Sequence, residues 1–217
     1  MRKSIALLSS LLFVAILFGC EVMKHEASSN QNKTRLMIVA HPDDEVLFGG
    51  NELINHEYYI VCLTNGDNEL REAEFQNMLD KTKNTGVILS YPDKVKGERS
   101  NWSKEQEVIS KEVEKIIITG DWDRIVTHNP QGEYGHIQHK KTNEIVTNVV
   151  KELHKEDTLY YFGEYFKKDD IAFKQKKLNK QEANQKREVL AVYESQKKTL
   201  SKLDHIVEYE ELVPYLK

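Results

Sequence analysis

Apolar residues fall into two patterns along the chain. Short continuous runs predict buried strands at residues 35–40, 58–66, 85–93, 123–130 and 158–165. Between these runs, apolar residues recur at helical spacing among charged ones, which predicts helices at residues 46–56, 69–84 and 103–118, within 132–153, and at 182–198. An acidic segment, residues 205–212, follows the last helix.

The alternation of strands and helices determines the expected fold class. Strands separated by helical segments predict βαβ units and therefore an α/β fold with a mostly parallel sheet. In an open α/β sheet, ligands bind beyond the carboxyl ends of the strands. The loops after residues 35–40 and 123–130 are therefore the first places to examine for chemistry.

The first 34 residues differ from the rest. Met1, Arg2 and Lys3 form a basic head, and residues 5–18 are almost entirely apolar, a stretch short of the roughly 20 residues that a spanning helix needs. This pattern predicts a secretory signal peptide at residues 1–19. The letters "LFGC" also resemble a bacterial lipobox, in which Cys20 becomes the acylated first residue of the mature protein. An uncleaved anchor helix and plain secretion are the alternatives.

A lipid on Cys20 would place the protein on the extracytoplasmic face of the cell membrane. Residues 20–34 are polar and lack periodicity, so we expect them to form the acylated cysteine and a flexible tether. Residues 35–217 are then expected to form a single domain, because 217 residues with 39% hydrophobic and 30% charged content suit one soluble core.

Charge and cysteine content narrow the choice of partners. The formal net charge of −4 gives no indication of a nucleic-acid partner. Of the two cysteines, Cys20 is expected to carry lipid, and Cys62 lies inside the apolar run "YYIVCLTN". We therefore expect no disulfide and a buried Cys62. No feature of the sequence indicates an oligomeric state.

The first strand leads directly into "AHPDDE", residues 40–45. Pro42 prevents the strand from continuing, so the three acids fall in the turn at the edge of the sheet. Three adjacent carboxylates repel one another unless a cation lies among them or they point apart into water. The alternative to a metal site is a solvated turn that caps the next helix.

A second loop carries two histidines at the expected start of a helix. His136 and His139 are three residues apart, which places both imidazoles on one helical face. Two imidazoles and one carboxylate make a three-ligand zinc site with an open fourth position. One of Asp43 and Asp44 can then bind the metal while the other faces the water, and the two histidines can divide in the same way. Such a set of groups suits amide hydrolysis, although two surface histidines would give the same spacing.

The two motifs together resemble those of the PIG-L/LmbE-like zinc-dependent de-N-acetylases. The resemblance runs from about Leu36 to Gln196 and includes "LTNGD" at 63–67, "REAE" at 71–74, "VTHNPQGEYGHIQH" at 126–139 and "YESQ" at 193–196. It implies a Rossmann-like three-layer sandwich. It also implies removal of acetyl groups from N-acetylglucosamine units on small thiols, lipids or glycans.

The resemblance also implies roles for individual residues. It makes Asp43 the general base and His136 the group that stabilises the oxyanion or protonates the amine, and it makes the zinc ligands His41, Asp44 and His139. Arg71 falls where the family often has a basic residue near the substrate.

Three further positions follow less directly from the pattern. His128 and Asn129 are polar residues at a strand end, so they are candidates to line the substrate mouth, and a structural role in the turn is the alternative. Gln138 stands where many members of the family have aspartate. A neutral glutamine is expected to support a charged His136 less well than an aspartate would.

Together these patterns predict an exported, membrane-anchored zinc hydrolase that deacetylates N-acetylglucosamine-type sugars of a cell-envelope glycan or glycolipid. Export disfavours an intracellular thiol substrate. One alternative is a non-catalytic surface lipoprotein that binds sugar or metal. A metal-dependent nucleotide-sugar transferase is a weaker alternative, because activated nucleotides are scarce outside the cytoplasm and a hard-metal site has no need of two histidines.

Overall fold

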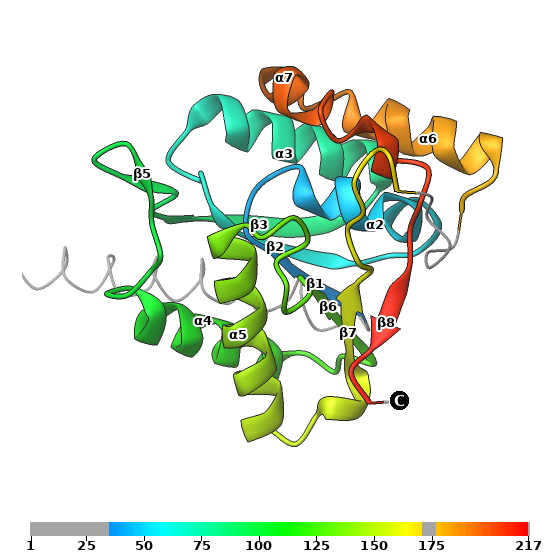
Figure 1. Cartoon of the computed structure of the whole chain (residues 1–217). Helices are drawn as coiled ribbons and strands as arrows, with labels where there is room; N and C mark the ends of the chain where they lie inside the picture. The colour runs from blue at the N-terminus through cyan, green and yellow to red at the C-terminus, as the bar shows by residue number, and fades with distance from the viewer. Residues whose placement is uncertain (1–34, 171–176, 217) are drawn as a thin grey trace, which may run out of the picture.

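The computed structural model describes residues 35–170 and 177–216. A six-stranded sheet runs through the centre in the order β3-β2-β1-β6-β7-β8 (Figure 1). Its strands are β1 (Arg35–Val39), β2 (Tyr59–Thr64), β3 (Thr85–Tyr91), β6 (Arg124–Thr127), β7 (Leu159–Phe162) and β8 (Leu212–Pro214). All neighbouring pairs are parallel except β7 with β8. The predicted α/β class with a mostly parallel sheet is confirmed.

Helices cover both faces of this sheet and complete the three layers. On one face lie α4 (Gln106–Thr119) and α5 (Ile137–Glu152), and on the other lie α2 (Asp44–Asn55), α3 (Glu69–Thr82) and α6 (Lys180–Leu190) (Figure 1). Alternate residues of β1 enter two separate apolar clusters, Met37 and Val39 on the α2 side and Leu36 and Ile38 on the α4 side. Burial on both faces explains why the strands read as continuous apolar runs.

Elements near the C-terminus and in the loops depart from the predicted pattern. The helix predicted at 182–198 ends at Leu190 and is followed by a 3-10 turn (η2, Glu194–Gln196) and a short helix, α7 (Lys197–Leu200). This break lets Tyr193 bury its ring and place its hydroxyl on Glu45. The helix predicted from residue 103 begins at Gln106. The sequence pattern also missed β8 and the hairpin of β4 (Lys94–Val95) and β5 (Glu98–Arg99).

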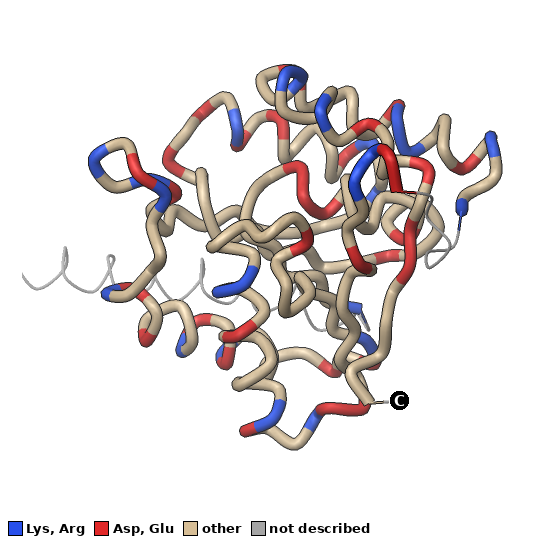
Figure 2. The backbone as a smooth tube through the Cα atoms, in the orientation of Figure 1, with Lys and Arg blue, Asp and Glu red and all other residues tan. Residues whose placement is uncertain are grey.

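The N-terminal predictions lie outside the described residues. The signal peptide at residues 1–19 and the acylated Cys20 with its tether at 20–34 all precede Arg35, where the description begins. Within residues 35–170 and 177–216, no helix has the length and hydrophobicity required to cross a bilayer. Cys62 is a free, buried thiol in β2, as expected. Basic and acidic residues are interspersed along the outer helices α3, α4 and α6 (Figure 2).

A buried ion pair stabilises α2 at a break in its helical geometry. Gly49 has non-helical φ and ψ angles of −136° and 20°, and the amide groups of the next turn need other acceptors. The carboxylate of Glu210 accepts the N–H groups of Asn51 and Glu52 at 2.9 and 2.8 Å. Lys186, which is fully buried, donates to the same carboxylate at 2.8 Å. The C-terminal segment therefore caps the second half of α2.

Replacing Glu210 with glutamine is expected to lower the free energy of unfolding by about 3–5 kcal/mol, because Lys186 would then be a buried charge without a partner. Urea unfolding monitored by circular dichroism measures this loss. The control is Glu208→Gln, which removes a partly exposed carboxylate that pairs with Lys177 and Arg187 and should cost less than about 1 kcal/mol. Equal losses in the two variants would contradict a stabilising role for the buried pair.

Candidate metal centre and active site

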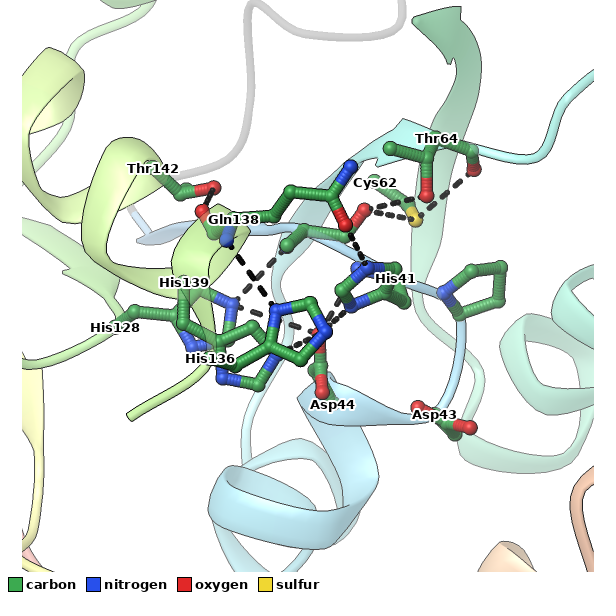
Figure 3. A network of polar contacts seen from close by, with 12 residues as sticks. His41, Asp43, Asp44, Cys62, Thr64, His128, His136, Gln138, His139 and Thr142 are labelled. Atoms are coloured by element: carbon green, nitrogen blue, oxygen red, sulfur yellow. Dashed lines mark hydrogen bonds and ion pairs between the residues drawn. The ribbon is translucent and has the colours of Figure 1, made fainter. Parts of the chain in front are cut away.

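The two polar loops meet at the carboxyl edge of the sheet. β1 and β6 are parallel neighbours, so the turn after β1 and the loop after β6 emerge side by side. Side chains of His41 and Asp44 from the first loop face His136 and His139 from the start of α5 (Figure 3). The ring centroids of His41 and His136 lie 4.7 Å apart, and those of His41 and His139 lie 5.3 Å apart.

The first loop is held in an uncommon backbone conformation. Asp43 has a φ angle of 116°, which non-glycine residues rarely adopt and which is found mostly where function requires it. Side chains stabilise this turn: the backbone N–H of His41 donates to Asp44 Oδ2 at 2.9 Å, and that of Asp43 donates to Glu45 Oε2 at 3.0 Å. The buried Glu45 in turn accepts the hydroxyl of Tyr193. These contacts fix Asp43 and Asp44 in place although their charges repel.

One oxygen of Asp44 is the point on which two imidazoles converge. Asp44 Oδ2 lies 3.0 Å from His41 Nδ1 and 3.3 Å from His139 Nε2. All three residues are buried. The contact of His139 Nε2 with Asp44 lacks hydrogen-bond geometry, so this nitrogen has no hydrogen-bond partner among the described residues. An unpartnered buried nitrogen is costly unless another group satisfies it. Neighbouring ligands of a tetrahedral metal ion such as zinc are about 3.3 Å apart, so the two separations from Asp44 Oδ2 are compatible with a metal site.

Two overlapping groups of possible donors share His139. One group contains His41, His136 and His139, and the other contains Asp44, His128 and His139; within each group the donor atoms lie within 4.8 Å of one another. His128 is a poor ligand, because its Nε2 already accepts the backbone N–H of Ala40 at 3.0 Å. Neither group contains all three predicted ligands, but Asp44 Oδ2 contacts both His41 and His139, and this shared contact is the basis on which we keep His41, Asp44 and His139 as the predicted ligand set.

His128 and Asn129 have internal hydrogen-bond partners. His128 is fully buried, and its Nδ1 donates to Glu133 Oε2 at 2.9 Å. Asn129 is buried as well; its side-chain N–H donates to Gly163 O, and its side-chain oxygen accepts the N–H of Glu133. These contacts agree with the structural role in the turn, and a contact of either residue with substrate stays a prediction.

Glu133 is a functional candidate that the sequence analysis missed. It has a φ angle of 51°, it is 6% exposed, and its Oε2 lies 2.6 Å from His139 Nδ1. A carboxylate behind a metal-binding histidine orients the ring and increases its basicity. Its place in "GEYGHIQH", six residues before His139, was the available signal.

Arg71 contacts the first loop. Its guanidinium donates to the carbonyl oxygen of Pro42 and lies 3.3 Å from Asp43 Oδ2. Glu74 pairs with Arg71 at 3.0 Å and also accepts the N–H and the hydroxyl of Ser195, both at 2.7 Å. Arg71 is only 6% exposed. Its observed contacts therefore hold Asp43 and the turn around it.

Burial and mutual charge set the ionisation of the first loop. Burial and the neighbouring Asp44 charge raise the pKa of Asp43 to about 7, against the opposing effect of Arg71. Burial alone would raise the pKa of Asp44, but the charges of His139 and His41 hold it well below its usual value. Burial likewise lowers the pKa of His41, yet Asp44 outweighs it and raises this pKa to about 10. In the metal-free protein, protons on the imidazoles thus supply the positive charge that Asp44 requires.

Comparison with known proteins agrees with this geometry. A family model described as PIG-L, GlcNAc-PI de-N-acetylase, matches residues 36–150, which is more than half of the chain. The chain belongs to the PIG-L family. The matched segment includes both loops, so the resemblance of "AHPDDE" and "GHIQH" to this family is confirmed.

Individual relatives show how far the likeness extends. The chain is 32% identical over 148 residues to the uncharacterized protein L374 of Acanthamoeba polyphaga mimivirus. It is 28% identical over 146 residues to a probable N-acetylglucosaminyl-phosphatidylinositol de-N-acetylase of Schizosaccharomyces pombe. These matches take in 60% and 58% of this chain, and the chain spans 63% and 57% of the two relatives' own lengths.

Solved structures extend the likeness to the fold. A deacetylase of the teicoplanin biosynthesis pathway superposes with a TM-score of 0.61 at 18% identity, covering 80% of this chain and 90% of its own. The conserved protein TT1542 from Thermus thermophilus gives 0.60 at 16% identity, covering 83% and 94%. The zinc-inhibited form of teicoplanin deacetylase Orf2 gives a TM-score of 0.58 at 17% identity, covering 80% of this chain and 90% of its own. At these identities the likeness establishes the shared fold of the PIG-L chain.

Gln138 plays a different part in this PIG-L protein from the one expected. Its side chain does not face His136; its Oε1 lies 2.8 Å from His41 Nε2, and its Nε2 donates to Pro92 O and Asp93 O. Only its backbone N–H meets His136, donating to Nδ1 at 3.3 Å. The side chain of residue 138 therefore positions His41 and the loop at Pro92, because it makes hydrogen bonds to both.

His136 is expected to make the stability of the metal-free protein depend on pH. Burial, followed by the charges of His41 and His139, lowers its pKa from 6.5 to about 3. Between these values the unfolded chain binds a proton that the fold does not, so stability falls as pH decreases. His136→Gln should therefore lose about 1 kcal/mol less than the parent between pH 7 and pH 5, a figure reduced for the partial exposure of the ring. Urea titrations in chelator at both pH values test this, and equal losses would contradict it.

Proposed function

We propose that this protein is a zinc-dependent N-deacetylase that removes acetyl groups from N-acetylglucosamine-type amino sugars. The observation that carries the proposal is the convergence of His41 Nδ1 and His139 Nε2 on Asp44 Oδ2, at 3.0 and 3.3 Å. Membership of the PIG-L family supports the reaction class. The names of the fission-yeast relative and of the teicoplanin deacetylase support an acetylated amino-sugar substrate.

The residues proposed to hold zinc are His41, Asp44 and His139. Two imidazoles and one carboxylate form a recognised catalytic zinc set that leaves a position open. When bound, zinc supplies Lewis acidity and brings the pKa of water close to neutrality. The donor types favour zinc over Mg²⁺ or Mn²⁺, which prefer oxygen ligands. The alternative function, a nucleotide-sugar transferase, would require Mg²⁺ or Mn²⁺ and is therefore disfavoured.

Asp43 is the proposed general base. It lies next to Asp44 on the strained turn, and Arg71 holds its carboxylate at 3.3 Å. In that position it would take the proton from the water that attacks the acetamide carbonyl. The proton would then pass to the amine nitrogen as the C–N bond breaks, giving acetate and a free amine.

His136 is proposed to stabilise the oxyanion. Its Nδ1 accepts the backbone N–H of Gln138, so the proton of the neutral ring is on Nε2. An Nε2–H group can donate to the carbonyl oxygen as negative charge develops there. Of the two roles that the family resemblance implies for this residue, the hydrogen bonding thus favours the oxyanion role over protonation of the amine.

The decisive experiment compares two substitutions. Asp43→Asn is expected to retain about one zinc per chain while losing a factor of about 10²–10⁴ in turnover, because the base is lost and the ligands remain. His139→Ala should lose both metal and activity, and chelator should abolish the activity of the parent protein. Metal content by atomic absorption and amine release from N-acetylglucosamine oligomers and glycolipids measure these effects. A zinc-loaded parent that releases no amine from any of them would favour a sugar-binding or metal-binding surface protein.

The cellular location is a second part of the proposal. The basic head at Met1–Lys3, the apolar run at 5–18 and the "LFGC" sequence ending at Cys20 support export followed by lipid anchoring. An enzyme tethered on the extracytoplasmic face would meet envelope glycan or glycolipid rather than a cytoplasmic sugar. A lipobox cysteine such as Cys20 receives more than one acyl chain, which is enough for stable attachment to a membrane.

Cys20→Ser in the full-length chain is expected to abolish incorporation of radiolabelled palmitate and to shift the protein out of the membrane fraction. The physical reason is the loss of the thiol to which the lipid is attached. Cys62→Ser is the matched control, since Cys62 is buried in β2 and should leave labelling unchanged. Undiminished labelling or membrane association of Cys20→Ser would exclude a lipid anchor at this residue.

A further inference from the structure

The two histidines proposed as metal ligands face Asp44 through different ring nitrogens. His41 directs Nδ1 toward Asp44 Oδ2, at 3.0 Å, and its Nε2 lies on the far side of the ring. His139 directs Nε2 toward the same oxygen, at 3.3 Å, and its Nδ1 lies on the far side. A neutral imidazole binds metal through its unprotonated nitrogen. The site therefore needs opposite tautomers in the two rings.

Gln138 fixes the tautomer of His41. Its amide nitrogen donates to Pro92 O at 3.2 Å and to Asp93 O at 3.0 Å, so its oxygen must be the atom that faces His41 Nε2 at 2.8 Å. An amide oxygen only accepts hydrogen bonds. His41 must therefore carry a proton on Nε2, and the proton that faces Asp44 from Nδ1 in the metal-free protein is the one that a metal ion would replace.

Glu133 fixes the tautomer of His139. Its Oε2 lies 2.6 Å from His139 Nδ1 and 2.9 Å from His128 Nδ1, while Oε1 accepts the N–H of Asn129 at 3.0 Å. A carboxylate that receives three donors accepts only, so both imidazoles must be protonated on Nδ1. His139 Nε2 is then the unprotonated nitrogen. Among the side-chain nitrogen and oxygen atoms of the described residues, it is the buried one without a hydrogen-bond partner.

His128 anchors Glu133 to the sheet. Its ring stacks on that of His139 with centroids 4.0 Å apart and an interplanar angle of 20°. Its Nε2 accepts the N–H of Ala40, the residue that follows β1. A continuous chain of hydrogen bonds thus runs from the end of β1 through His128 and Glu133 to His139, and it holds the ring of His139 rigidly.

We propose that Glu133 and Gln138 are positioning residues that hold His139 and His41 in opposite tautomers, so that Nε2 of one and Nδ1 of the other face the same metal ion. This inference rests on the proposed zinc function, and it assigns to two further residues the orientation of the ligands. Neither residue contacts the ion in this arrangement; each acts through the imidazole that it touches.

The first test is Glu133→Gln. An amide can satisfy the two imidazole N–H groups or the N–H of Asn129, but not both sides, because one of its ends donates. Zinc affinity, measured by competition with a chromophoric chelator, is expected to fall 10- to 100-fold. Gln138→Met removes the nearer acceptor of His41 Nε2 at similar side-chain length and leaves only Asp93 Oδ1, which lies 3.5 Å away. This variant should weaken zinc binding in the same range.

Glu52→Gln is the control. Glu52 lies near the C-terminal end of α2, and its carboxylate contacts Tyr58 and Arg124 rather than an imidazole of the site. This variant should bind zinc like the parent protein. Circular dichroism and urea unfolding in chelator establish that each variant is folded. If Glu52→Gln loses zinc affinity to the same extent as Glu133→Gln, the effect is a general loosening of the fold and the proposal is overturned.

Nitrogen-15 spectra of the imidazoles in the zinc-loaded parent give an independent readout. We expect the remaining ring proton on Nδ1 of His139 and on Nε2 of His41. The reverse assignment for either ring, or wild-type zinc affinity in both Glu133→Gln and Gln138→Met, would overturn the inference and leave the zinc function intact. A parent protein that binds no divalent metal would overturn both.

Discussion

Asp44 Oδ2 is the atom on which the organisation of this protein depends. It accepts the backbone N–H of His41 and lies within 3.3 Å of one nitrogen from each of two imidazoles. A carboxylate that is only 2% exposed is strongly destabilised unless positive charge surrounds it. Protonated imidazoles meet this requirement in the metal-free chain, and a divalent cation would meet it without those protons. The two adjoining acids have partners of their own: Asp43 pairs with Arg71, and Glu45 accepts the hydroxyl of Tyr193.

The sheet topology satisfies this constraint by bringing distant segments together. β1 lies between β2 and β6, so the turn at Asp43 and the start of α5 share one edge although nearly a hundred residues separate them. Gln138 ties the two loops together and also contacts the backbone ahead of the β4–β5 hairpin. The site is therefore built from three connections of the sheet, each of which follows the carboxyl end of a parallel strand.

The C-terminal third of the chain supports the first loop from the face of the sheet that carries α2, α3 and α6. Tyr193 contacts Glu45, Ser195 contacts Glu74, and Glu210 caps the second half of α2. Tyr193, Ser195 and Glu210 lie beyond the segment that the PIG-L family model matches, residues 36–150. The two loops of the proposed site thus lie within the segment that the family model matches, and residues after that segment contact Glu45 and Glu74 beside them.

The sequence by itself determined the fold class, the family and the two loops, because short apolar runs and the spacing of His41, Asp43, Asp44, His136 and His139 are local features of the chain. Only the tertiary structure assigned partners. It placed His128 and Asn129 inside the protein, turned Gln138 toward His41 and put Glu133 behind His139. It also ended α6 so that Tyr193 could reach Glu45. The contacts of Gln138 with His41 and of Tyr193 with Glu45 join segments far apart in sequence, so periodicity and motif spacing do not assign them. Glu133 lies only six residues before His139, but its side-chain direction depends on the backbone conformation of the loop between them.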